Sequence, residues 1–107
     1  MKNVSFNSVE LRGRAGTVRI SPGGESIVAN FSLMTEYEQK TVEGKTIIDA
    51  CWHNVAAFQS ENVCLDGLTR GSLVHLEGRL RNCRYTAVDG SERMFTEIIA
   101  SSLKVVE

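Results

Sequence analysis

Hydrophobic and polar residues alternate along five segments of the chain, which is the pattern of half-buried β-strands. In residues 72–85, Val74, Leu76 and Leu80 alternate with polar side chains. Gly78 interrupts this alternation, as expected where a small barrel bends or another backbone comes close. The pattern predicts four further strands, at residues 7–20, 26–37, 46–58 and 92–106.

The segment between the third and fourth predicted strands has a different pattern. Residues 59–68 lose the period of two, and Val63, Leu65 and Leu68 suit a short helix with Ser60 as its N-cap. Three strands, one short helix and two strands are the order of an OB-fold, a five-stranded Greek-key barrel. We therefore predict one all-β domain over residues 1–107. An SH3-like barrel is the alternative, but its strands are shorter and it usually has no helix there.

Composition limits the class of protein further. The chain has 107 residues, 42% of them hydrophobic and only one proline, which fits a single globular core. No apolar stretch is long enough to span a membrane, and the N-terminus lacks the apolar core of a signal peptide. These features predict a cytoplasmic protein.

Cysteine and histidine residues offer little chemistry. The chain has three cysteines and two histidines, and no two of the cysteines form a Cys-x-x-Cys pair. The sequence therefore predicts no disulfide framework, no metal site and no cofactor. Cys51 and His53 share one strand face, but no orienting acid or oxyanion hole accompanies them. We therefore expect a binding protein, not an enzyme.

The arginines are separated from the acidic residues along the chain. The net charge is -1, which argues against a strong generic binder of polyanions. However, the only charges between Leu11 and Gly24 are Arg12, Arg14 and Arg19, and those between Gly78 and Val88 are Arg79, Arg81 and Arg84. Charge alone favours a positive groove and ordinary solvated strand faces equally.

Aromatic residues accompany these arginines. Trp52 and Phe58 are six residues apart on one predicted strand, so they share a face about 20 Å apart. Separate bases of a nucleic acid strand can stack on rings at this spacing. Periodicity alone favours the alternative that both rings are buried in the core. Tyr85 directly follows the second group of arginines and offers a third ring.

The ordered set of motifs resembles bacterial single-stranded DNA-binding proteins over essentially the whole chain. The matching segments are N-x-V-x-L-x-G-x-x-G at residues 7–16, Trp52-His53-Asn54-Val55 with Phe58, residues 70–74, residues 77–81, and Asp89-Gly90 with Arg93 and Thr96-Glu97. The resemblance implies sequence-tolerant binding of single-stranded DNA in replication, recombination and repair. It also implies a homotetramer, with His53 near a subunit contact.

The resemblance also indicates the binding residues. It favours base stacking on Trp52, Phe58 and Tyr85, and adds Tyr37 as the aromatic nearest to a second family tryptophan. The residues expected to neutralise phosphates are Arg12, Arg14, Arg19, Arg70, Arg81 and Arg84. Of these, Arg70 and Arg84 stand where the family carries DNA-contacting lysines.

One departure from the family pattern leaves an alternative open. Family members typically continue into a flexible linker and an acidic tip that recruits other enzymes, whereas this chain stops at Glu107. We therefore expect a short form without tail-mediated protein partners. A primosomal replication protein of the same fold, which bridges DNA and a helicase, is the alternative that chain length favours.

Overall fold

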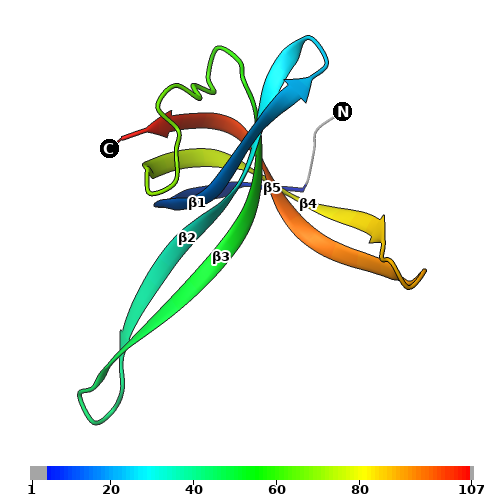
Figure 1. The fold of residues 1–107 in the computed structure, drawn as a ribbon. Coiled ribbons are helices and arrows are strands. Elements are labelled where there is room, and N and C mark those ends of the chain that lie inside the picture. The colour runs from blue at the N-terminus through cyan, green and yellow to red at the C-terminus, as the bar shows by residue number, and fades with distance from the viewer. Residues whose placement is uncertain (1–4, 107) are drawn as a thin grey trace.

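Five strands close into a single barrel in the computed structural model, which describes residues 5–106 (Figure 1). The strands are β1 (Val9–Gly23), β2 (Ser26–Lys40), β3 (Thr46–Phe58), β4 (Leu73–Thr86) and β5 (Glu92–Val105). They close in the order β1-β2-β3-β5-β4, with β3 and β5 parallel and the other neighbours antiparallel. This topology is that of the OB-fold, so the predicted fold class is confirmed.

The helix predicted between the third and fourth strands is wrong. Residues 59–72 form turns, with isolated bridges that join Val63 to Ser60 and to Leu103 of β5. Backbone groups of this segment bond to β5: the Cys64 N–H donates to the Leu103 carbonyl, and the Leu103 N–H donates to that of Asn62. The apolar residues behind the helix prediction are nonetheless buried: Val63, Leu65 and Leu68. Their spacing thus reflects a loop that covers the barrel end.

Inward-facing side chains at every second position fill the barrel. Leu33, Val55, Val74 and Leu76 come from three different strands and are almost completely buried. Their neighbours along each strand point outward, as the pleat of a β-strand requires. We call the surface of the sheet that faces away from this core the outer face.

A β-bulge in β1 changes which residues point outward. Ala15 pairs with Leu33 and Val18 pairs with Phe31, so β1 contains one more residue than β2 between these pairs. Such an extra residue reverses the inward and outward alternation beyond it. Arg14 and Arg19, five positions apart, therefore lie on the same outer face, where a regular strand would place them on opposite faces.

Two hairpins extend beyond the barrel as arms. The β2–β3 pairing continues to Lys40 and Thr46, and the β4–β5 pairing continues to Thr86 and Glu92. Figure 1 shows the two arms pointing in different directions from the barrel.

Within residues 5–106 no helix is long and apolar enough to cross a membrane.

A second irregularity surrounds Gly78, as the sequence pattern predicts. Glu77 pairs with Ser102 and Gly78 pairs with Ala100, so the ladder passes over Ser101 of β5. At this bend the backbone of Gly78 lies so close to the Ile99 carbonyl that a Cβ atom would collide with it. Only glycine fits without a shift of one of the two strands.

We therefore expect Gly78→Ala to lower the free energy of unfolding by about 1–3 kcal/mol, because the added methyl group must push β4 and β5 apart. Urea denaturation measures this loss. Thr86→Ala, at the exposed end of the same strand, is the matched control and should change the free energy by less than about 0.5 kcal/mol. Equal stability of both variants would contradict the close approach.

Candidate functional site

Paired residues on neighbouring strands form rows across the outer face. The rows are Arg14–Met34–Trp52, Ser32–Asn54–Glu97–Arg81, Arg19–Asn30–Ala56–Ile99–Arg79 and Ser21–Val28–Phe58. Trp52 and Phe58 therefore belong to the first and last rows, with two largely polar rows between them. The strand register places both aromatic rings on one surface with several arginines.

Both aromatic residues of β3 lie at the surface. Trp52 is 61% exposed and Phe58 is 46% exposed. A Cβ atom on Gly16, at the β1 bulge, would lie 3.0 Å from Cζ3 of Trp52, so the edge of the indole rests against this glycine. The interpretation of both rings as core residues is therefore wrong for this chain.

Tyr85 contributes a third exposed ring, and it has an aromatic neighbour that the sequence analysis missed. Tyr85 is 52% exposed, and its ring centroid lies 5.9 Å from that of Phe95 at an interplanar angle of 62°. Phe95 pairs with Cys83, two residues from Tyr85 on the same face. The turn at Asp89-Gly90 sets the register of this hairpin, in which odd positions of β4 pair with odd positions of β5. That register could have revealed that Phe95 lies on the face of Tyr85.

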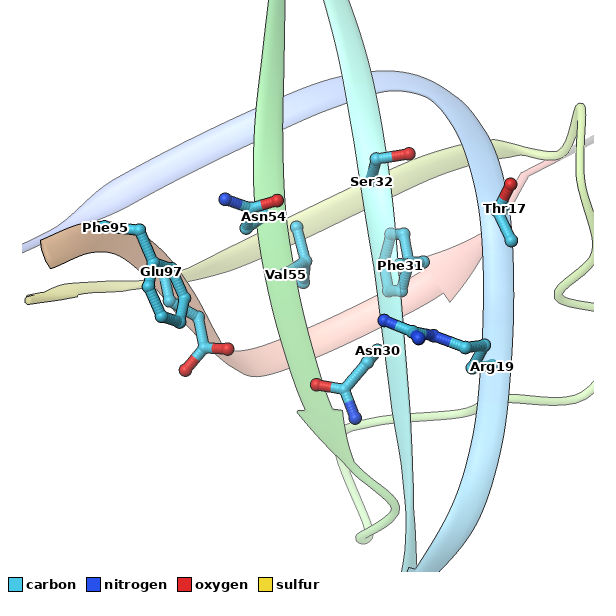
Figure 2. A pocket seen from close by; sticks show the side chains of 9 residues that line it. All are labelled: Thr17, Arg19, Asn30, Phe31, Ser32, Asn54, Val55, Phe95 and Glu97. Atoms are coloured by element: carbon cyan, nitrogen blue, oxygen red, sulfur yellow. The ribbon is translucent and has the colours of Figure 1, made fainter. Parts of the chain in front are cut away.

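A hollow of about 380 Å³ opens between the outer rows (Figure 2). Its lining comes from four strands: Thr17, Arg19, Asn30, Phe31, Ser32, Asn54, Val55, Phe95 and Glu97. Figure 2 shows Arg19 extending across β2 from one side, with Phe95 and Glu97 on the opposite side. Among these residues, the sequence analysis assigned a binding role only to Arg19.

Glu97 binds Arg81, one of the arginines predicted to neutralise phosphates. Nη2 of Arg81 donates to Oε1 of Glu97 at 2.7 Å, and the Cys83 thiol donates to the same oxygen at 3.5 Å. The hydrogen bond to Glu97 raises the pKa of the Arg81 guanidinium. Arg81 thus lies on the outer face, but its charge is already balanced there.

Arg14 is hydrogen-bonded to the loop that carries Arg70, at the other side of the site. Nη1 of Arg14 donates to the carbonyl of Gly71 at 3.1 Å, and Gly71 directly follows Arg70. The Gly71 N–H in turn donates to the Ala15 carbonyl at 2.8 Å, which fixes the loop against β1. These two bonds join the loop that carries Arg70 to β1, close to Arg14 of the Trp52 row.

Arg12 belongs to a different cluster, on the β1–β4 side of the barrel. Its Nε donates to Nδ1 of His75 at 3.4 Å, and Nε2 of His75 bonds to Glu10 at 2.9 Å. Ligand atoms of Glu10, His75 and Glu77 lie within 4.8 Å of one another, a grouping that could hold a metal ion. The sequence analysis missed it because two strands far apart in the chain supply the residues.

Two further predicted residues point away from the outer face. Tyr37 pairs with Asp49 on the side of the β2–β3 arm opposite to Trp52. Arg84 pairs with Met94 on the side of the β4–β5 arm opposite to Tyr85. Both side chains are exposed, but the structure does not bring them together with the rows of the outer face.

This geometry defines a class of protein: an OB-fold barrel with exposed aromatic rings and arginines on one face. The family model described as the single-strand binding protein family matches residues 6–106. The chain therefore belongs to this family.

Related sequences agree with this assignment. The single-stranded DNA-binding protein of Neisseria meningitidis serogroup A, strain Z2491, is 35% identical over 96% of this chain and 61% of its own length. That of Xylella fastidiosa, strain Temecula1, is 32% identical over 94% of this chain and 63% of its own length. The chain thus spans less than two thirds of these relatives.

Solved structures share the fold. An SSB from Plasmodium falciparum, in complex with single-stranded DNA, superposes with a TM-score of 0.84 at 26% identity, over the full length of both chains. A small single-stranded DNA-binding protein from Streptomyces coelicolor gives a TM-score of 0.71 at 17% identity, over 92% of each chain. The second likeness is one of fold alone.

His53 lies on the inner side of β3, next to the β2 strand. Its Nε2 shares a hydrogen bond of 2.9 Å with the Thr35 hydroxyl. Partial burial lowers the pKa of His53 from its ordinary value of 6.5. The unfolded chain therefore takes up this proton more readily than the folded chain does, and acid favours unfolding.

We expect the free energy of unfolding to fall as the pH drops below about 6.5, where the unfolded His53 gains its proton first. His53→Asn removes this titration but keeps a group able to bond Thr35. Urea denaturation of both proteins on either side of this pH should show a smaller acid loss for the variant. Parallel curves over the whole range would contradict the assignment to His53.

Proposed function

We propose that this chain binds single-stranded DNA with little sequence preference and without chemical catalysis. Exposed aromatic rings stack on bases, and arginines neutralise phosphates. The observation that carries the proposal is the register that places Trp52 and Phe58 on one face with Arg14 and Arg19. Family membership and the DNA-bound Plasmodium relative support it.

The proposed path of the strand follows the rings. Bases stack on Trp52, Phe58 and Tyr85, about 20 Å separating the first two along β3. Arg14 and Arg70 meet phosphates beside Trp52. Arg19 does so from the row that lies between those of Trp52 and Phe58.

The remaining predicted residues form the outer part of the proposed site. Arg81 contributes only if DNA competes with Glu97 for its guanidinium. Arg12, Tyr37 and Arg84 contact DNA where the strand passes around the barrel or onto the other sides of the arms. Such wrapping would bring all predicted residues into one extended interface.

The proposed role is to coat single strands during replication, recombination and repair, in the cytoplasm. A protein of net charge -1 gains little from long-range attraction to phosphates, so stacking must supply a large share of the affinity. Pyrimidine runs are the preferred sites, because preference in this binding mode comes from stacking and backbone flexibility.

We also propose that the chain forms a homotetramer. Ile47 and Ile48 are both exposed and, as neighbours in β3, lie on opposite sides of the β2–β3 arm. A second copy of the chain would cover apolar surface that a single barrel leaves in water.

Trp52→Ala and Phe58→Ala should each weaken binding to poly-dT by about 1–3 kcal/mol, the usual loss for one base–aromatic stack. Because both rings are exposed, the thermal melting curves should stay nearly unchanged. Fluorescence serves as the readout for the wild type, because Trp52 is the only tryptophan and stacking should quench it. Gel shifts serve for the Trp52 variant.

Val42→Ala, at the exposed tip of the β2–β3 arm, is the control and should bind like the wild type. Tyr37→Ala tests the path, since a loss of affinity would show that DNA crosses to the other side of this arm. Absence of quenching and of any gel shift at low salt would refute the function. A loss of about 3–5 kcal/mol in stability in these alanine variants would instead show that the rings are buried in the core.

Light scattering should give the mass of a tetramer at micromolar concentration. Ile47→Lys and Ile48→Lys each place a charge on one side of the arm, and the variant whose side is buried should dissociate. A monomeric mass for the wild type would contradict the proposed assembly but would leave DNA binding by one barrel possible.

A further inference from the structure

The ion pair between Arg81 and Glu97 places a negative charge within the outer face. Arg81 of β4 pairs directly with Glu97 of β5, and Glu97 pairs in turn with Asn54 of β3. The ion pair therefore belongs to the row next to that of Trp52. Under the proposed function, a DNA strand that stacks on this ring passes close to a carboxylate, which repels phosphates.

We propose that Glu97 keeps Arg81 in a neutral pair while DNA is bound, and so withholds one cation from the phosphates. The proposal rests on the proposed function, because it concerns the strength of the same binding face. Glu97 then limits the affinity of the outer face. Arg81, although predicted to neutralise a phosphate, does not do so in the wild-type protein.

The fold brings the two charges together before DNA arrives. Arg81 and Glu97 lie directly opposite each other in the β4–β5 ladder, where opposite charges attract across the strands. Nη2 of Arg81 lies 2.7 Å from Oε1 of Glu97, which is the length of a charge-assisted hydrogen bond. A phosphate must therefore compete with a partner that is already in place.

The two side chains are exposed to different degrees, and this opposes their separation. The side chain of Arg81 is 50% exposed, whereas that of Glu97 is only 12% exposed. If a phosphate drew Arg81 away, the carboxylate would stay largely buried without its cation, which is costly. The Cys83 thiol donates to the same Oε1 at 3.5 Å, but a thiol is too weak a donor to replace a guanidinium.

Arg19 provides the contrast within the same face. Its row contains no acidic residue, since the other members are Asn30, Ala56, Ile99 and Arg79. Figure 2 shows its side chain extending over β2, with Glu97 on the opposite side of the hollow. The charge of Arg19 is therefore offered to a phosphate, whereas that of Arg81 is cancelled at its own position.

The salt dependence of binding counts the cations that meet phosphates. For single strands, the slope of log affinity against log salt concentration changes by about 0.7 for each phosphate neutralised. Glu97→Gln keeps an oxygen that can accept from Arg81 but removes the negative charge. This variant should bind poly-dT several times more tightly than the wild type, with a slope steeper by about 0.7.

Arg81→Gln tests the other half of the pair. It leaves the carboxylate of Glu97 without its cation and should weaken binding to poly-dT. Adding Glu97→Gln to this variant should restore the affinity and the slope of the wild type, because it removes two charges that cancel each other there. If Arg81 itself neutralised a phosphate, the double variant would keep a slope shallower by about 0.7, and the proposal would be wrong.

Two further variants are matched controls. Glu92→Gln removes the same charge from an exposed position of the same hairpin and should leave the slope unchanged. Arg19→Gln removes a cation that the proposed function places on a phosphate, and should make the slope shallower by about 0.7. Quenching of Trp52 fluorescence gives each affinity, and thermal melting shows that each variant is folded during the titration.

The outcomes separate this proposal from the general function. If the wild type does not bind poly-dT, the proposed function fails and the role of Glu97 fails with it. If the wild type binds but Glu97→Gln neither tightens binding nor steepens the slope, single-strand binding stands and only the role of Glu97 is wrong. Weaker binding by folded Glu97→Gln would show that the carboxylate positions Arg81 on a phosphate, which also refutes the proposal.

Discussion

The antiparallel ladder between β2 and β3 is the constraint on which the arrangement of the outer face depends. It runs without interruption from Val28 and Phe58 to Lys40 and Thr46. A slip of one residue would turn Trp52 and Phe58 toward the core and expose Val55 and Ala57 instead. Burial of the small and branched residues of β3 therefore keeps its large aromatic residues at the surface. Stability and function depend on the same alternation.

The β1 bulge shifts this alternation so that Arg14 and Arg19 both lie on the outer face. A regular strand would send Arg14 and Arg19 to opposite faces, and one of them would enter the core unpaired, at high cost. The extra residue between Ala15 and Val18 resolves the conflict. It also places Gly16 beneath the edge of Trp52, where any side chain would collide with the ring or with Ser32. One irregularity thus positions an exposed aromatic ring and two cations on the outer face.

The alternation of hydrophobic and polar residues with a period of two was sufficient to predict the five strands and the shared face of Trp52 and Phe58. The order of the strands then indicated the OB-fold. The alternation could not tell which face was buried, because aromatic residues suit both environments. The helix failed because the spacing of Val63, Leu65 and Leu68 resembles a helical face, while their backbone bonds to β5 depend on tertiary contact. Phe95 and Glu97 were missed because their positions follow from register between strands, which alternation along one strand does not contain.

Charge on the outer face is arranged locally, and this explains how a protein of net charge -1 can offer a basic path. Arg81 is balanced by Glu97 within the site, whereas Arg19 has no acidic residue among the residues of its row. Glu36 and Glu38 share the Trp52 side of the β2–β3 arm, but farther from the barrel. Under the proposed function, attraction to phosphates is therefore strongest on the barrel and weakens along the arm. A DNA strand bound in this way would depend on stacking for its affinity and on the few barrel arginines for its position.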